Sequence, residues 1–122
     1  MIDVKLAILM VLTPDLIEAQ AFYEGVLGFS VHKASEDLLV LDHQGVALHV
    51  YRCEAPAPVL RHGRDAATTA VFAVASIEDA MTVLTQKGVK FLHNAPASNA
   101  FGRYAAFKAP GGNIHEIFEP HA

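Results

Sequence analysis

The residue best placed to do chemistry is Glu116, which follows the turn-forming run Pro110–Asn113 near the end of the sequence. Proline fixes one φ angle and Gly-Gly-Asn tolerates positive φ, so this run predicts a tight turn between two short strands. Because side chains alternate along a strand, Ile114, Glu116 and Phe118 share one face. A carboxylate between apolar side chains is costly unless it is paired or bound to a metal. Glu116 is therefore a candidate catalytic or metal-binding residue, and Phe118 a candidate ligand contact.

A second pair of polar side chains comes from the apolar run Val46–Arg52. His49 and Tyr51 share one strand face, where an imidazole and a phenol with an apolar body suit the wall of a ligand site. The alternative is structural, with His49 as a hydrogen-bonded core or surface histidine and Tyr51 as a packing residue. Both remain candidate ligand-binding residues.

Arg103 and Tyr104 follow a glycine at the start of an expected strand, beside the loop 94–101. A loop of this kind can close over a ligand, so one of the two residues is expected to orient an anionic or aromatic molecule. The alternative is a solvated strand edge, in which Arg103 or Lys108 pairs with Glu116 and leaves that carboxylate no role in a site.

The remaining side chains capable of chemistry are expected to be exposed or inert. Five histidines fall in linker, turn or strand-end positions and are expected to be exposed: His32, His43, His62, His93 and His121. Arg61, His62 and Arg64 form a small basic cluster that we interpret as solvated. Cys53 has no histidine nearby in a nucleophile arrangement, so we interpret it as unreactive.

The bulk composition excludes several classes of protein. The chain has 122 residues, 52% hydrophobic and 18% charged, which is typical of a compact globular protein. A net charge of −4, with no basic cluster larger than the small one at residues 61–64, gives no electrostatic basis for binding nucleic acid. The single cysteine suits a reducing compartment, and the apolar start 1–12 contains Asp3 and Lys5, so it predicts a core strand. We expect a soluble cytoplasmic protein with no membrane partner.

The chain repeats one order of elements, namely strand, helix and three strands. The first copy is predicted in residues 1–53, with strands at 5–11, 29–33, 38–42 and 46–52 and a helix from Thr13 to Gly28. After a linker at 54–66, residues 67–122 repeat the order, with strands at 68–75, 89–93 and in the final hairpin, and a helix capped by Ser76. Ile17 and Ile77 are 60 positions apart, and Gly45 and Gly112 are 67 apart. The second offset gives His49 the place of Glu116.

Two segments resemble the vicinal oxygen chelate superfamily, which includes glyoxalase I, bleomycin resistance proteins and extradiol dioxygenases. Ala21–Phe29 is similar to the end of the family's first helix, and Phe107–Glu116 is similar to its closing Phe-x-Asp-Pro-Asp-Gly-Asn-x-x-Glu. Ala109 and Gly111 depart from that pattern, since many relatives have aspartate there. The resemblance and the repeat together predict an α+β fold, in which two βαβββ modules form a curved mixed sheet around a cavity.

The resemblance also implies where metal ligands would lie. Metal-dependent members place His or Glu on the fourth strand of each module, which corresponds here to Glu116 and to His49. Sliding the alignment by one residue would substitute Leu48 for His49. The family's remaining ligands come from the first strand of each module. Those places fall on Ile8 or Leu9, which cannot bind a metal, and on Thr69, which is a poor ligand but a candidate ligand contact.

His49 and Glu116 are thus two candidate metal ligands, whereas a divalent ion that acts as a Lewis acid needs about three from the protein. We therefore expect no cofactor, with a divalent metal as the alternative. The predicted function is binding of a small aromatic or polar organic molecule in an apolar cavity of a homodimer, as in bleomycin-resistance-like relatives. The alternative is a metal-dependent lyase or dioxygenase that uses His49 and Glu116.

Overall fold

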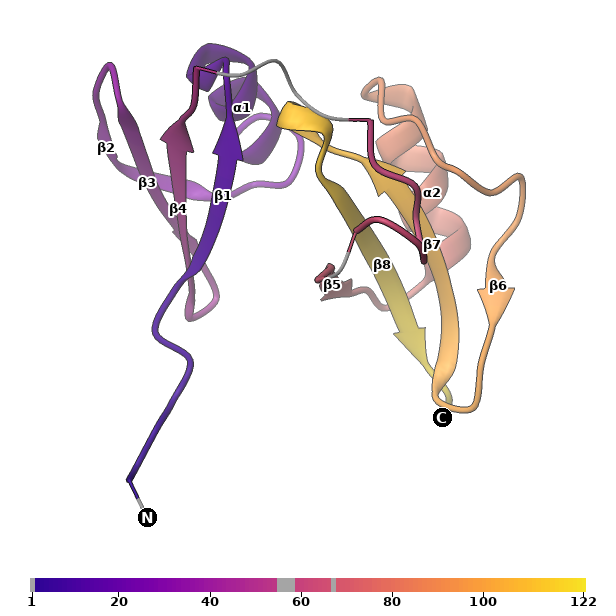
Figure 1. The fold of residues 1–122 in the computed structure, drawn as a ribbon. Helices are drawn as coiled ribbons and strands as arrows, with labels where there is room; N and C mark the ends of the chain where they lie inside the picture. The colour runs from indigo at the N-terminus through magenta and orange to yellow at the C-terminus, as the bar shows by residue number, and fades with distance from the viewer. Residues whose placement is uncertain (1, 55–58, 67) are drawn as a thin grey trace. The chain divides into compact units, whose positions relative to one another are not determined.

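The computed structural model describes residues 2–54, 59–66 and 68–122 (Figure 1). The chain divides into two compact units, residues 1–57 and residues 58–122. Each unit contains one helix and one four-stranded sheet, and each is described by itself below.

The first unit contains β1 (Leu9–Thr13), α1 (Leu16–Tyr23), β2 (Ser30–Ala34), β3 (Leu38–His43) and β4 (Val46–Arg52). The strands lie in the order β1-β4-β3-β2, with β1 parallel to β4 and the other pairs antiparallel. The buried side chains Leu48 and Val50 of β4 pair with Leu41 and Leu39 of β3 on one face of the sheet. Because α1 packs on β3 and β4, this face forms the core of the unit.

The second unit contains β5 (Ala70–Ala73), α2 (Ile77–Gln86), β6 (Ala97–Ser98), β7 (Gly102–Lys108), a short 3-10 turn η1 (Pro110–Gly112) and β8 (Ile114–Pro120). The strand order is β5-β8-β7-β6, with β5 parallel to β8 and the remaining pairs antiparallel. Gly111 in the turn has φ of +77°, which residues with a side chain rarely adopt. The turn predicted from Pro-Gly-Gly-Asn is therefore confirmed, and it sets the register of β7 and β8.

Both units thus have the same order of elements and the same order of strands. A parallel pair between the first and fourth strands, combined with antiparallel neighbours, makes each sheet mixed. The α+β class and the repeated βαβββ module predicted from the sequence are confirmed. Their enclosure of a common cavity stays a prediction.

Several boundaries differ from those predicted, each for a local reason. The first strand was expected at residues 5–11 but spans Leu9–Thr13, because its ladder to β4 begins at Leu9. Asp15 caps α1 in place of Thr13, since its Oδ1 accepts hydrogen bonds from the backbone N–H groups of Ile17 and Glu18 at 3.0 and 3.1 Å. Ser76 caps α2 as predicted.

The strand predicted at residues 89–93 is reduced to a single bridge between Phe91 and Phe107. The loop predicted at residues 94–101 contains the two-residue strand β6, which pairs with β7 instead. Edge pairing with β7 is therefore shared between two short segments, and His93 lies between them outside any strand. No helix in the described part of the chain has the length and apolar content needed to cross a membrane.

Candidate functional site

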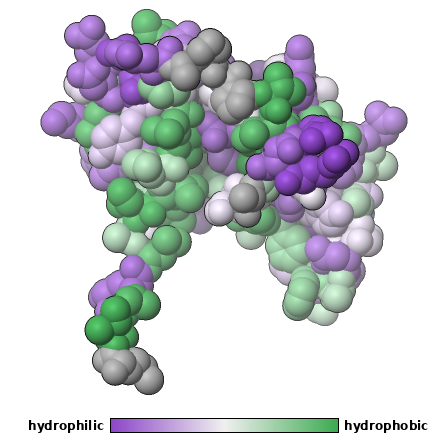
Figure 2. Space-filling view, in the orientation of Figure 1, coloured by the Kyte–Doolittle hydropathy of each residue, from purple (hydrophilic) through white to green (hydrophobic). Residues whose placement is uncertain are grey.

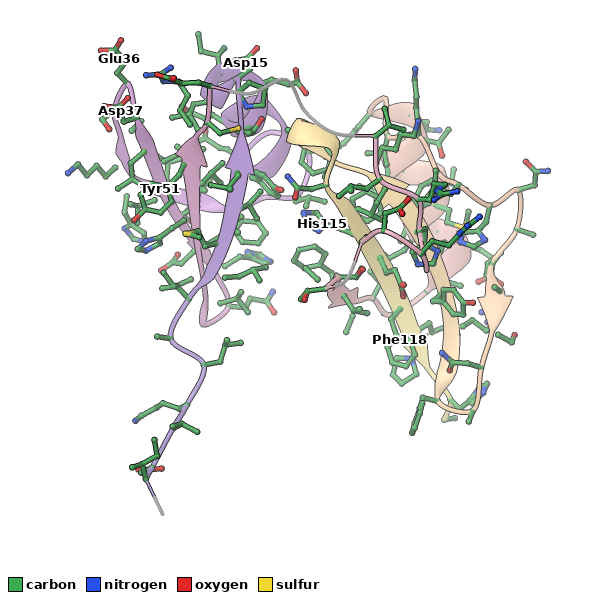
Figure 3. All side chains as sticks on the ribbon, viewed as in Figure 1. Asp15, Glu36, Asp37, Tyr51, His115 and Phe118 are labelled. Atoms are coloured by element: carbon green, nitrogen blue, oxygen red, sulfur yellow. The ribbon has the colours of Figure 1, made fainter. Side chains whose placement is uncertain are left out.

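Glu116 lies on β8, the central strand between β5 and β7, opposite Val71 and Ala106. Residues directly opposite each other share a sheet face, so Tyr104, Glu116 and Phe118 lie on one face of the β7–β8 hairpin. The other face carries Arg103 and Glu119 and is covered by α2. Figure 3 labels Phe118 and the neighbouring His115, which alternation along β8 assigns to opposite faces.

Arg103 is bound on the α2 face and is not the partner of Glu116. Its guanidinium donates to both oxygens of Glu78 on α2 and, through Nη2 at 2.9 Å, to Oε2 of Glu119. Oε1 of Glu119 also accepts a hydrogen bond from the backbone N–H of Ile77 at 2.9 Å, at the start of α2. The hydrogen bonds that Arg103 donates to the two carboxylates raise the pKa of Arg103 and lower the pKa values of Glu78 and Glu119. This network fixes α2 to the hairpin.

The partner of Glu116 is His62, whose Nε2 lies 2.7 Å from Oε2 of the carboxylate. The side chains of His62 and Glu116 are 23% and 18% exposed, so both are largely removed from water. The expectation that His62 is exposed is therefore wrong. A carboxylate on this partly apolar face needs a hydrogen-bond donor, and the imidazole supplies it.

A small folded turn holds His62 in that position. The carboxylate of Asp65 accepts hydrogen bonds from the backbone N–H of Arg61 at 3.1 Å and from its Nε at 2.6 Å. The backbone N–H of Asp65 in turn donates to the Arg61 carbonyl at 3.0 Å. Gly63 has φ of +77°, a conformation that only glycine adopts readily. The residues interpreted as a solvated basic cluster thus form a closed turn that directs His62 toward the hairpin.

Two further rings lie around this pair. The centroid of the His62 ring is 5.9 Å from that of His93 and 6.5 Å from that of Tyr104. His93 and Tyr104 meet edge to face, with centroids 5.8 Å apart. We call these four residues, His62, His93, Tyr104 and Glu116, the polar–aromatic cluster.

One buried polar atom of the polar–aromatic cluster has no protein partner among the described residues. Nε2 of His93 is buried and makes no hydrogen bond there, although the sequence predicted an exposed side chain. A buried ring nitrogen without a partner costs free energy, on the order of 1–3 kcal/mol, that a bound molecule can recover. Tyr104 was predicted as a site residue, whereas His62 and His93 were missed.

The candidates of the first unit lie on the sheet face opposite its core. His49 pairs with Met10 and Val40, and Tyr51, labelled in Figure 3, follows it on the same face with 37% exposure. Leu48, the other possible counterpart of Glu116, is 1% exposed and belongs to the buried face. His49 and Glu116 therefore both lie on the sheet face away from the helix of their own unit, as the 67-residue offset predicted. Their ligand roles stay predictions.

The two remaining candidates lie beside Glu116 in the second unit. Thr69 directly precedes β5 and is half-buried, two positions before Val71 in the ladder to Glu116. Phe118 follows Glu116 on the same face of β8 and is also half-buried. Their roles as ligand contacts stay predictions.

The residues of the second unit do not fit a complete divalent metal site as they stand. No group of three His, Cys, Asp or Glu side chains that could hold an ion occurs among the residues described. In the polar–aromatic cluster, Nε2 of His62 and Oε2 of Glu116 are directed at each other, so both would have to turn to bind an ion.

Several solved structures are similar to this chain in fold. TnmS3, an antibiotic binding protein from Streptomyces sp. CB03234, superposes with a TM-score of 0.72 at 17% identity, covering 99% of each chain. The fosfomycin resistance protein FosX from Listeria monocytogenes, complexed with Mn(II) and sulfate, gives a TM-score of 0.79 at 14% identity, covering 98% of this chain and 93% of that one. A glyoxalase/bleomycin resistance protein/dioxygenase from Nocardioides gives 0.74 at 21% identity, with 98% and 85% covered.

At these identities the solved structures show the fold, and the family follows from the sequence. No curated protein matches the chain. The profile of the Glyoxalase/Bleomycin resistance protein/Dioxygenase superfamily matches residues 5–117, which span both units. The resemblance noted from the helix end and the closing hairpin is thereby confirmed, and the chain belongs to the glyoxalase/bleomycin resistance protein/dioxygenase superfamily.

Proposed function

We propose that this protein binds a small aromatic or polar organic molecule at the polar–aromatic cluster, and that binding requires no metal ion. Tyr104 supplies a ring for stacking, and Nε2 of His93 supplies a hydrogen bond to a polar atom of the ligand. Phe118 and Val71, on the same sheet face as Glu116, supply the apolar contacts.

The observation that carries the proposal is the buried Nε2 of His93, which has no hydrogen-bond partner among the described residues and lies beside the Tyr104 and His62 rings. Buried polar atoms are paired in the great majority of native structures, so an unpaired one beside aromatic rings suits a site completed by a ligand. The Glu116 carboxylate, paired with His62, holds that imidazole in place and supports the wall of the site.

The relatives favour the same kind of function. TnmS3 is described as an antibiotic binding protein, and its fold matches this chain over almost its whole length. Antibiotics with planar rings and polar substituents have the chemistry that the Tyr104 ring beside the His93 imidazole can hold. We therefore propose an antibiotic with planar rings and polar substituents as the class of ligand.

We also propose that the protein acts in the cytoplasm, because its single cysteine, Cys53, suits a reducing compartment.

The second candidate function is a metal-dependent lyase or dioxygenase in which His49 and Glu116 bind the ion. It is supported by the similarity in fold to FosX, which has been solved with Mn(II). For Glu116 to act in this way, its carboxylate would have to exchange the His62 imidazole for the ion. The two candidates therefore differ in whether ligand binding depends on a metal.

The test is equilibrium binding in the presence of EDTA. A panel of aromatic antibiotics that includes bleomycin is screened by the shift in thermal unfolding of the purified protein. Compounds that stabilise it are then measured by isothermal titration calorimetry, first in EDTA and then in Mn²⁺. We expect saturable binding with the same affinity in both solutions.

The matched variants are Tyr104→Ala and Phe101→Ala. Phe101 lies in the same unit but is 76% exposed and outside the polar–aromatic cluster, so its variant should bind as the wild type does. Loss of Tyr104 should weaken binding about fivefold or more, since one stacking aromatic side chain contributes on the order of 1 kcal/mol or more. Binding that appears only with added Mn²⁺ would favour the metal-dependent enzyme, and equal affinities of the two variants would place the ligand elsewhere.

A further inference from the structure

The second sheet carries an unbalanced negative charge on the face that holds Tyr104, Glu116 and Phe118, which we call the site face. The Glu116 side chain is only 18% exposed, and its partner His62, in the neutral form, supplies a hydrogen bond but no positive charge. Arg103 lies on the opposite face, where it binds two glutamates. A carboxylate among apolar and aromatic side chains is costly until a positive charge compensates it.

The other basic side chains near the site face are engaged elsewhere or exposed. Arg61, in the turn that carries His62, is paired with Asp65 through its Nε and Nη2 atoms. Arg64 of the same turn is exposed. Lys108 lies on the site face, two residues along β7 from the position opposite Glu116, and it is exposed as well. Exposed cations stay hydrated and contribute little to a partly buried carboxylate, so a bound cation is the strongest partner that Glu116 can gain.

Aromatic rings lie beside this carboxylate. The Tyr104 ring centroid is 6.5 Å from that of His62 and 5.8 Å from that of His93. The face of a tyrosine ring attracts a cation that comes within about 6 Å of its centroid. The buried Nε2 of His93 can accept an N–H hydrogen bond in the tautomer that leaves its lone pair free. Carboxylate, ring and imidazole together have the chemistry that recognises an organic ammonium group.

The turn that carries His62 forms a polar wall beside the site face. Figure 1 draws residues 59–66 in front of β7 and β8, and Figure 2 shows strongly hydrophilic residues at that place on the visible face of the second unit. His62 reaches from this turn to Glu116. A ligand at this boundary can direct a charged group toward Glu116 and an aromatic group toward Phe118 on the sheet.

We propose that the ligand is an arylalkyl amine, protonated at neutral pH, and that Glu116 selects it by charge. The ammonium group donates hydrogen bonds to the Glu116 carboxylate and to Nε2 of His93, and its charge lies against the Tyr104 ring. A carboxylate has about four lone-pair positions, so the hydrogen bond from His62 leaves room for the ligand. This inference rests on the proposed function, because it names the class of ligand for the same polar–aromatic cluster.

Three probes of similar shape and different charge test the selection. They are 2-naphthylmethylamine, which is a cation at pH 7, the neutral 2-naphthylmethanol, and the anion 2-naphthoate. Equilibrium dialysis of the full chain in EDTA gives the dissociation constant of each probe. The amine should bind about tenfold more tightly than the alcohol, because it gains both the cation–π contact and the charge-assisted hydrogen bond. The naphthoate should bind more weakly than the alcohol, since Glu116 repels it.

Two matched variants locate the charge that selects the amine. Glu116→Gln keeps the shape and an oxygen that accepts the His62 hydrogen bond, and it should lower the ratio of amine to alcohol affinity from about tenfold to about twofold. Glu18→Gln makes the same change in net charge on the exposed surface of α1, in the first unit, and should keep the wild-type ratio. Each ratio compares two probes on one protein sample, so it does not depend on how much of a variant is folded.

Equal affinities of the amine and the alcohol for the wild type would overturn selection by charge and leave the aromatic site in place. An unchanged ratio in Glu116→Gln would show that another group selects the amine, and tighter binding of the naphthoate would assign the opposite charge to the ligand. Absence of binding by all three probes would contradict the aromatic site itself, and the proposed function with it.

Discussion

His62 and Glu116 are 54 positions apart in the sequence, yet the imidazole Nε2 lies 2.7 Å from the carboxylate Oε2. The contact joins the turn at residues 61–65 to the central strand of the second sheet. The contact brings the His62 imidazole to a sheet face where Glu116 was the only ionisable group predicted from the sequence. The polar–aromatic cluster is organised around this pair.

A double-mutant cycle with His62→Gln and Glu116→Gln, measured by urea unfolding at pH 7, should give a coupling energy of about 1 kcal/mol. The coupling is expected because water does not fully replace a hydrogen bond to a carboxylate that has little solvent exposure. The matched control is His32 and Asp42 in the first unit, whose Nε2 and Oδ2 are 2.9 Å apart but whose side chains are 57% and 49% exposed. Their coupling should be close to zero. Equal couplings in the two cycles would contradict the account of a protected pair.

His115 should make the protein sensitive to mild acid. Burial lowers the pKa of this side chain to about 4, beside the rings of Phe72 and Phe107 at 5.6 and 5.9 Å. The unfolded chain binds the proton near pH 6.5 and the folded chain only near pH 4. Stability should therefore be constant above about pH 6.5 and fall by about 3 kcal/mol between pH 6.5 and pH 4.

The measurement is the free energy of unfolding in urea at several pH values, for the wild type and for His115→Phe. The phenyl ring keeps an aromatic edge against Phe72 and Phe107 but cannot bind a proton. The variant should therefore lose the decline between pH 6.5 and pH 4. A decline of the same size in both proteins would show that another group is responsible.

The Arg103 network should contribute a separate acid dependence at lower pH. The pKa values of Glu78 and Glu119 are lowered by hydrogen bonds from Arg103, so this stabilisation is present above the ordinary glutamate pKa and is lost as pH falls through the lowered values. Arg103→Met should lower the urea midpoint at pH 7 and reduce the further loss of stability below about pH 4.5. The salt dependence of that midpoint should also decrease, because the paired groups are partly exposed.

Gly102→Ala should destabilise the second unit strongly. A Cβ atom at Gly102 would overlap the backbone carbonyl of Glu119 and lie 2.8 Å from Cα of Pro120, so the β7–β8 ladder would have to separate. We expect a loss of about 3 kcal/mol in urea unfolding. Gly88→Ala is the control, since φ of +93° makes it strained but, apart from Gly88 and its two chain neighbours, none of the described residues lies within 4 Å of the new Cβ. It should cost about 1 kcal/mol. Equal losses would contradict the close approach at Gly102.

The fold was predictable because its signals are local and occur twice. Pro-Gly-Gly-Asn set the hairpin, Ser76 marked the start of α2, and Gly88, which has positive φ, directly follows its C-cap Lys87. The first helix was expected to run to Gly28 but ends at Tyr23. The strand predictions that were wrong concern segments at the edges of the two sheets. Whether residues 89–93 or 97–98 pair with β7 depends on competition for one sheet edge, which no local pattern records.

The candidate site was predictable only where alternation governs it. The alternation of side chains along a strand assigned Glu116 and Phe118 to one face of β8. The 67-residue offset between the two modules assigned His49 to the equivalent face of the first unit. His62 and His93 lie outside regular strands, so no periodicity gives their direction. The Arg61–Asp65 spacing with Gly63 between them signals a turn, but the path of that turn toward Glu116 depends on tertiary packing.

The most direct measurement of the proposed function follows the histidine ring nitrogens by long-range ¹H–¹⁵N NMR during titration with a compound selected by the screen, in EDTA. The account predicts that the His93 and His62 resonances shift saturably, with the dissociation constant found by calorimetry. His32, exposed in the first unit, should remain unchanged. Saturation by calorimetry while the His93 and His62 resonances stay in place, or a shift that needs added Mn²⁺, would contradict it.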